Sequence, residues 1–238
     1  MFDWLHRKTN LTLPERDIHN HLLPGVDDGF RTADDSLRAI TKMVENGVRE
    51  IVFTPHMNPD VYPNESEAHF REVYEKFNFQ LSTFNFQLEV ALAAEYMVVK
   101  DFEQRVSAHA DQLLTYPDRS ILIEMSYFFR SRNFEDALFE LNMAGLRPIV
   151  AHPERYLYMA DSLADYDRWV DMGARLQLNL LSLTGTYGPT SVKIMRHLLS
   201  HGMYSFVATD LHTNSQLDRI LTTKVDSKLL KLLAHTRE

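Results

Sequence analysis

A regular alternation of short apolar runs with stretches of helical periodicity, beginning after Glu15, constrains the fold more than any other feature of the sequence. Seven runs are predicted as strands, at residues 16–19, 48–54, 88–94, 121–125, 148–151, 175–180 and 206–209. A predicted helix follows each strand. The first starts near Thr32 or Asp34 and ends at Gly47, the next five are at residues 65–76, 102–109, 134–143, 163–172 and 191–200, and residues 217–233 are predicted to be mostly helical. No linker-like stretch separates the units, which predicts one α/β domain with a parallel sheet.

The number of units narrows the architecture further. Seven strand–helix units in about 220 residues suit a barrel of the TIM type that is one unit short. We therefore expect a single barrel domain over residues 16–238, with residues 1–15 as an N-terminal extension outside the pattern. Phe2, Trp4 and Leu5 in that extension are expected to pack on the barrel exterior or on a neighbouring subunit, which leaves an oligomer open.

Composition excludes several classes of protein. The 238 residues include no cysteine, which excludes disulfides, thiolate metal sites and a phosphatase with a Cys nucleophile. The chain has 25 Lys and Arg against 33 Asp and Glu, a net charge of −8, and no basic cluster, so nucleic acid is not an expected partner. No run approaches ~18 apolar residues, and residues 1–16 lack the apolar core of a secretory signal. We expect a cytoplasmic protein that is not integral to a membrane.

Side chains that can bind metals stand at or just after the carboxyl ends of six predicted strands. They are His19, His21, Asp28, His56, Glu95, Glu124, His152, Asp210 and His212. The loops after barrel strands converge at that end, and these nitrogen and oxygen donors suit Mn²⁺, Zn²⁺ or Fe. Taken singly, such a histidine is more often a polar loop residue, and Glu124 has a structural salt bridge as its alternative. The coincidence of nine such residues on one rim favours a metal site.

The size of this set indicates the chemistry. One Zn²⁺ or Mn²⁺ uses three or four protein ligands, so nine predict two or three ions. Adjacent ions serve phosphoryl or carbonyl hydrolysis, because they generate hydroxide near neutral pH and neutralise developing negative charge. Arg155 follows His152 closely and could bind a phosphate with two N–H groups, or instead pair with Glu154 or another carboxylate.

Aromatic side chains crowd the predicted loops. They are Tyr62, Tyr96, Tyr127, Phe128, Tyr156 and Tyr187. Packing in the core or against the barrel helices explains at least half of them, whereas a few could flank an aromatic leaving group.

The candidate ligands belong to an ordered set of short motifs. These are DIHNH at 17–21 with PGVDDG at 24–29, TPH at 54–56, AEY at 94–96, LIE at 122–124, AHPERY at 151–156 and TDLH at 209–212. From about Asp17 to Leu217 the chain closely resembles the metal-dependent bacterial protein-tyrosine phosphatases of the PHP (polymerase and histidinol phosphatase) superfamily. The resemblance is to the branch linked to capsule and exopolysaccharide synthesis, and HLLPGVDDG and HPERY are its most specific segments.

This resemblance implies a distorted (βα)7 barrel with three metal ions, often Mn²⁺ or Fe, at the carboxyl ends of the strands. It assigns His19, His21, Glu95 and Asp210 to one ion, Glu95 with Glu124 and His152 to a second, and Asp28, His56 and His212 to the third. It also implies hydrolysis of phosphotyrosine by metal-activated hydroxide, with Arg155 on the phosphate oxygens and no covalent phosphoenzyme. The implied partner is a tyrosine kinase with a tyrosine-rich tail that controls polysaccharide export.

One position departs from the family pattern. Members often carry an arginine a few residues after Asp-x-His, whereas here Arg219 comes late and is expected to point away from the rim. Two alternative functions remain at this stage. One is a small-molecule phosphomonoesterase such as a histidinol-phosphate phosphatase, and the other is a regulator that binds phosphotyrosine with little turnover.

Overall fold

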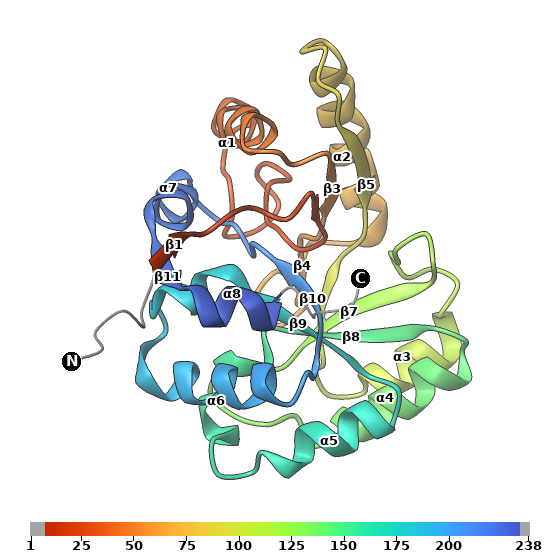
Figure 1. The fold of residues 1–238 in the computed structure, drawn as a ribbon. Coiled ribbons are helices and arrows are strands. Elements are labelled where there is room, and N and C mark those ends of the chain that lie inside the picture. Colours follow the sequence, from red (N-terminus) through yellow and green to blue (C-terminus); the bar gives the residue numbers. More distant parts are fainter. Residues whose placement is uncertain (1–7, 234–238) are drawn as a thin grey trace, which may run out of the picture.

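The computed structural model describes residues 8–233, whose parallel strands form two sheets (Figure 1). The smaller sheet has the order β2 (Arg16–Asp17), β3 (Glu50–Phe53) and β5 (Glu89–Leu92). The larger has the order β10 (Tyr204–Ala208), β9 (Arg175–Asn179), β8 (Arg147–Ala151), β7 (Ser120–Glu124), β6 (Glu95–Met97) and β4 (His56–Met57). All neighbours in both sheets are parallel, as the alternating pattern predicts.

A second, shorter strand follows each of two predicted strands in the structure. The run at 48–54 contains β3, and β4 begins beyond it, after Thr54 and Pro55. The run at 88–94 contains β5, and β6 begins beyond it, at Glu95. Pro55 has no N–H to give to a ladder, so the pairing is interrupted at the point where the chain passes from one sheet to the other. The residues just after β2 and just after β10 meet through an isolated parallel bridge between Asn20 and Leu211. The predicted distorted barrel is confirmed, and continuous hydrogen bonding among the described strands does not close it.

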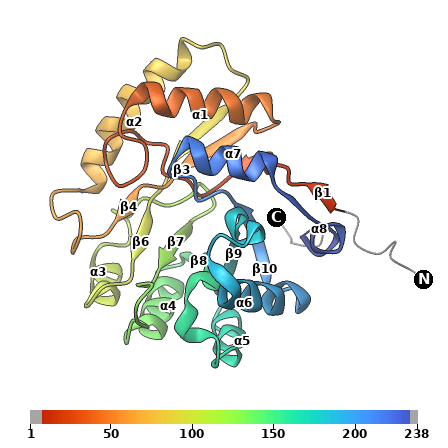
Figure 2. The same ribbon diagram turned by 90° about the vertical axis from the view of Figure 1, so that its left-hand side faces the viewer.

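Eight helices cover the outside of the described strands, with α3 to α6 on one side and α1 and α2 at the opposite end (Figures 1 and 2). They are α1 (Ala33–Glu45), α2 (Glu67–Ser82), α3 (Phe102–His109), α4 (Phe134–Met143), α5 (Ala164–Asp171), α6 (Gly188–Ser200), α7 (Asn214–Thr222) and α8 (Ser227–Leu233). Thr32 is the N-cap of α1 and accepts a hydrogen bond from the Asp35 N–H, as its position predicts. None of these helices is long and apolar enough to cross a membrane.

The prediction that residues 217–233 are mostly helical is confirmed, and a short strand that was not predicted interrupts them. α7 ends at Thr222, and β11 (Lys224–Asp226) pairs antiparallel with β1 (Lys8–Asn10) before α8 begins. Two consecutive β-branched threonines favour the extended backbone that ends α7. Leu11 and Leu13, which follow β1, are buried in the core, so this part of the N-terminal extension packs on the domain. Phe2, Trp4 and Leu5 lie outside the described residues.

A small cluster of buried side chains fills the space that the strands of the barrel enclose. It consists of Ile18, Val52, Ala93, Tyr116, Leu122, Ile149, Ala151 and Ala208. Side chains of a strand alternate between its two faces, so the neighbours Ile121 and Ile123 pack instead in the larger cluster that contains helix residues. Tyr116 donates a hydrogen bond to the carbonyl oxygen of Ile18 (2.6 Å) within the interior. Polar side chains begin where this cluster ends, at the carboxyl ends of the strands.

Candidate metal centre

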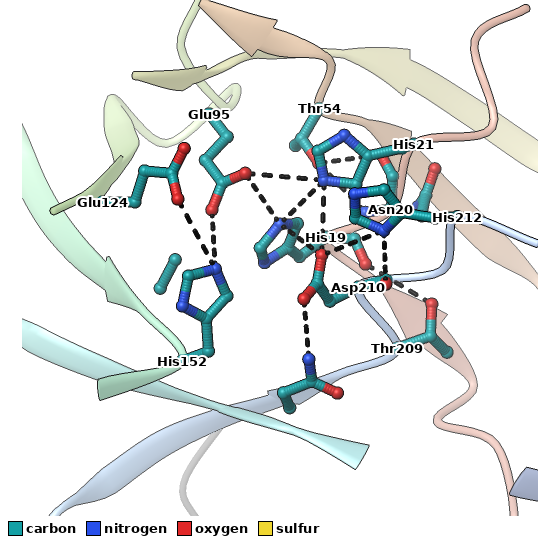
Figure 3. Close-up of polar contacts among 12 residues, drawn as sticks. His19, Asn20, His21, Thr54, Glu95, Glu124, His152, Thr209, Asp210 and His212 are labelled. Carbon is teal, nitrogen blue, oxygen red and sulfur yellow. Dashed lines mark hydrogen bonds and ion pairs between the residues drawn. The ribbon is translucent and has the colours of Figure 1, made fainter. Parts of the chain in front are cut away.

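All nine side chains predicted as metal ligands lie together at the carboxyl ends of the strands. Figure 3 shows all of them except Asp28 and His56 with their labels. They form four overlapping groups, in each of which one ligand atom per residue lies within 4.8 Å of the others. The groups are His21–Asp28–His56–His212, His19–His21–Glu95, His19–His152–Asp210 and His56–Glu95–Glu124. Within residues 8–233 these groups consist of the nine predicted ligands alone.

The local backbone explains how these side chains converge. His19 and His21 flank Asn20 just after β2, and Asn20 turns the other way to donate from Nδ2 to the carbonyl oxygen of Val52 (3.1 Å). His152 directly follows β8, Asp210 is the second residue after β10, and their φ angles are 32° and 50°. Left-handed backbone at a non-glycine residue costs of order 1–3 kcal/mol and is concentrated at functional sites. The fold tolerates this strain at two of the predicted ligands.

Several buried atoms of the cluster have no hydrogen-bond partner among the described residues. They are Glu95 Oε2, Glu124 Oε1 and Oε2, Asp210 Oδ1, His56 Nδ1 and His152 Nδ1. Leaving a carboxylate oxygen buried without a donor is costly unless a cation compensates for it. Histidine nitrogens and carboxylate oxygens are the donors that Mn²⁺, Fe and Zn²⁺ accept. This set of atoms therefore fits divalent metal ions.

Glu95 occupies the middle of the cluster. Its Oε2 atom lies 3.0 Å from His56 Nδ1, 3.3 Å from His19 Nε2 and 3.5 Å from His21 Nε2. Its Oε1 atom lies 3.0 Å from His152 Nε2. One carboxylate thus faces ligand atoms of several groups at once, which is the geometry that a bridging ligand requires.

Two carboxylates of the cluster, those of Glu95 and Asp210, have lowered pKa values, which favour their charged form. Burial alone would raise the pKa of Glu95, but His19 and His56 beside it hold that pKa well below its ordinary value. Burial alone would also raise the pKa of Asp210, but His19 and Arg155 are among the groups that hold that pKa well below its ordinary value. The site therefore presents negative charge to a cation, while protons and metal ions compete for its histidine nitrogens.

Two further residues orient histidines of the cluster. Asp27 Oδ2 lies 2.7 Å from His21 Nδ1, and Gln177 Oε1 lies 2.9 Å from His19 Nδ1. Burial lowers the pKa of His21, but the charge of Asp27 raises it well above its ordinary value. Each contact directs the Nε2 atom of the histidine towards the cluster, as outer partners of metal ligands commonly do.

Sequence reasoning passed over both of these residues. Asp27 is adjacent to Asp28, and the sequence alone does not tell which of the two carboxylates faces the cluster. Gln177 lies between two leucines in β9 and is fully buried, and a polar residue between buried apolar neighbours is the signal that could have identified it.

Gly29 lets the loop after His21 approach the cluster. A Cβ atom added there would lie 2.2 Å from the His21 carbonyl oxygen and 2.5 Å from the His21 Cβ atom. No side chain fits without moving His21, which accounts for glycine at the end of the PGVDDG motif.

Arg155 lies at the edge of the cluster and is paired with Asp210. Its Nη1 atom donates to Asp210 Oδ2 (2.6 Å), and its guanidinium carbon lies 4.2 Å and 4.4 Å from the ring centres of Tyr127 and Tyr187. The aromatic faces and the carboxylate hold the cation in one orientation. The ion-pair alternative noted for Arg155 is therefore realised, with Asp210 as the partner.

Glu154 and Arg219 have no place in the cluster. Glu154 is buried and accepts hydrogen bonds from the Asn179 N–H (2.9 Å), Ser182 Oγ (2.6 Å) and Tyr204 OH (2.9 Å). Glu154 is thus not the carboxylate that pairs with Arg155 in the structure. Arg219 is an exposed residue of α7, in agreement with the expectation that it points away.

The crowded aromatic residues divide between core and site. Tyr96 and Tyr156 are fully buried in the core. Tyr62 stacks near His56, with ring centres 6.2 Å apart, and Phe128 is 89% exposed. Tyr62, Tyr127 and Phe128 line a cavity of about 920 Å³ that also reaches the candidate ligands. The side chains of Tyr62, Tyr127 and Phe128 are therefore placed to contact a molecule bound in this cavity.

Comparison with known proteins agrees with this geometry. Residues 16–226 match the family described as capsular polysaccharide synthesis, CpsB/CapC. Tyrosine-protein phosphatase YwqE of Bacillus subtilis (strain 168) is 33% identical over 197 residues, which cover 82% of this chain and 76% of YwqE. Tyrosine-protein phosphatase CpsB of Streptococcus pneumoniae is 28% identical over 204 residues, which cover 82% of each chain.

Solved structures support the same relationship. A crystal structure from a study of YwqE from Bacillus subtilis and CpsB from Streptococcus pneumoniae, described as unique metal-dependent tyrosine phosphatases, superposes with a TM-score of 0.77. It is 32% identical and covers 91% of this chain and 85% of the other. The phosphotriesterase homology protein from Escherichia coli, at 16% identity and a TM-score of 0.50, shares the fold. The resemblance predicted from the motifs is confirmed, and the protein belongs to the CpsB/CapC family of capsular polysaccharide synthesis.

Proposed function

We propose that this protein is a metal-dependent protein-tyrosine phosphatase that hydrolyses phosphotyrosine in a protein substrate. The observation that carries the proposal is the cluster of nine nitrogen and oxygen donors with unpartnered buried carboxylate oxygens. The activity named for YwqE and CpsB, metal-dependent tyrosine phosphatases of similar sequence, supports the same reaction here.

We assign three ions to the cluster, with Mn²⁺ favoured over Fe or Zn²⁺. One would be held by His19, His21, Glu95 and Asp210, a second by Glu95, Glu124 and His152, and the third by Asp28, His56 and His212. In support of the first set, Asp210 Oδ1 lies 3.4 Å from His19 Nε2 and 3.3 Å from His21 Nε2. Divalent ions bound in such a site activate water and neutralise charge on phosphoryl oxygens.

The protein's own contribution centres on Arg155. Among the described residues, Asp210 accepts the only hydrogen bond of the guanidinium, so its other N–H groups are available to the non-bridging oxygens of a phosphate. Asp210 is held in turn by Arg155 and by Asn179 Nδ2 (2.6 Å), both on Oδ2, which leaves Oδ1 facing the histidines. Arg155 would thus bind substrate and also keep a predicted ligand in place.

Replacing Arg155 with alanine is expected to lower kcat/KM for a phosphotyrosine peptide by about a hundredfold, because a cation aimed at the transferred group is lost. Steady-state kinetics of the Mn²⁺-loaded variant measures this. R219A is the matched control, because it removes an exposed arginine of α7, and it should keep activity within about twofold of the unaltered protein. Equal losses in both variants would contradict the assignment of Arg155.

The substrate itself is tested by comparing kcat/KM of the Mn²⁺-loaded protein on a phosphotyrosine peptide and on histidinol phosphate. We expect a strong preference for the peptide. A preference for histidinol phosphate would make the protein a small-molecule phosphomonoesterase. Tight binding of the peptide with negligible hydrolysis would instead indicate a phosphotyrosine-binding regulator.

We further propose that the phosphorylated partner is the tail of a bacterial tyrosine kinase of capsule or exopolysaccharide synthesis, met in the cytoplasm. The family description, which names capsular polysaccharide synthesis, supports this assignment.

A further inference from the structure

The cavity of about 920 Å³ lies beside the outer part of the metal centre. Asp28, His56 and Glu124 form part of its wall, so a phosphate ester bound at the cluster has this space next to it. A second cavity, of about 430 Å³, is lined by Arg16, Glu50 and other residues at the opposite ends of the strands, and none of the predicted ligands lines it. Of these two cavities, the larger is the one continuous with the site.

The outer wall of this cavity carries exposed apolar side chains. Phe128, Phe129 and Val61 are 89%, 65% and 59% exposed, and all three line the cavity. Single exposed apolar residues are ordinary, but several on the rim of one cavity mark a binding surface. Phe128 and Phe129 follow β7, which ends in Glu124, so the same chain segment joins the apolar wall to the metal centre.

The charges around the cavity balance one another. Apart from Asp28 and Glu124 in the cluster, its lining includes three acidic and three basic residues, namely Asp60, Asp101, Glu103, Lys100, Arg130 and Arg132. Arg130 is already paired with Asp165 (2.7 Å) and Glu135. With Arg130 neutralised in this way, the lining offers no excess of positive charge to an acidic segment, which leaves apolar contact as the basis of selection.

The cavity is also larger than one side chain requires. Its volume is at the upper end of the about 300–1,000 Å³ that drug-sized ligands occupy. A phosphotyrosine that reaches the cluster therefore leaves space for a neighbouring side chain of the same polypeptide.

We propose that this cavity is a subsite for the polypeptide that flanks the phosphotyrosine, and that it takes an uncharged segment with a bulky apolar or aromatic residue next to the phosphotyrosine. The inference rests on the proposed function and adds the class of sequence on which the enzyme acts. Phe128, Phe129 and Val61 provide the contact surface, and the site then prefers a protein substrate over a small phosphate ester because only the former fills the cavity.

The test uses two five-residue phosphotyrosine peptides with blocked ends, identical except for leucine or glycine on both sides of the phosphotyrosine. We expect the Mn²⁺-loaded protein to prefer the leucine peptide by about tenfold in kcat/KM, mainly through KM, as the contact of one apolar side chain provides. In the double variant F128A/F129A this preference should fall to near one. The double variant F79A/F139A removes two aromatic side chains that are also exposed, at 75% and 56%, and should keep the preference.

The outcomes separate the subsite from the function. Equal kcat/KM for the two peptides in the unaltered protein, or a preference that survives in F128A/F129A, would overturn the subsite while leaving the phosphatase intact. Failure to hydrolyse either peptide would overturn the proposed function itself.

Discussion

Replacing Glu95 with glutamine is expected to lower kcat on phosphotyrosine by about a thousandfold. The decrease is expected because the variant loses both metal binding and charge complementarity at the reacting group. Glutamine keeps the shape of the side chain and removes only its negative charge. Because Glu95 belongs to two of the four ligand groups and contacts four histidines, that charge has no substitute in the cluster. The assay is kcat at saturating Mn²⁺, together with the metal content per chain.

The matched control for this variant is E89Q, which alters an exposed glutamate of β5 and should leave kcat and metal content unchanged. Near-normal activity of E95Q with a full complement of metal would contradict the assignment of Glu95 as a bridging ligand. Low activity with a full complement of metal would instead give Glu95 a role in the reaction other than holding the ions.

Removal of metal is expected to abolish hydrolysis, and Mn²⁺ is expected to restore it. Ions that bind the folded chain alone also stabilise it, by about 2.7 kcal/mol at a free concentration 100 times Kd. For a chain of this size that is an increase in Tm of about 5–10 °C. Thermal unfolding with chelator and with Mn²⁺ measures this increase without reference to activity.

The E95Q variant serves as the control for the thermal experiment as well, because it should show a smaller increase in Tm with Mn²⁺. Hydrolysis that persists after exhaustive chelation, in protein shown to contain no metal, would contradict a metal-dependent reaction. If Mn²⁺ restores activity but leaves Tm unchanged, the expected stabilisation of the folded chain by metal would be wrong, and the metal-dependent reaction would stand.

Much of the fold was predictable because local signals agree with the tertiary structure. α3 and α4 have the predicted bounds, 102–109 and 134–143, since apolar periodicity and the following loop residues mark both ends. The short strand inside the mostly helical stretch 217–233 was not predicted, because its pairing partner decides it. Pairing of β11 with β1 depends on residues more than 200 positions apart, and no local pattern over 217–233 records it.

The candidate ligands were predictable for a topological reason. Parallel strands of a barrel bring their carboxyl ends to one rim, so His19, Glu95 and Asp210 can be placed together from their positions in the alternating pattern alone. Their metal-binding roles stay predictions until the experiments above are done.

The sequence by itself determined the parallel α/β architecture and the candidate ligands, because strand–helix alternation and the residues at strand ends are local properties of the chain. Only the tertiary structure decided that Asp27 and Gln177 orient the histidines, that Arg155 pairs with Asp210, and that a cavity with exposed apolar side chains on its wall borders the ligand cluster. Those contacts join residues from separate strands and loops, and their partners are set by packing distances that no single segment encodes.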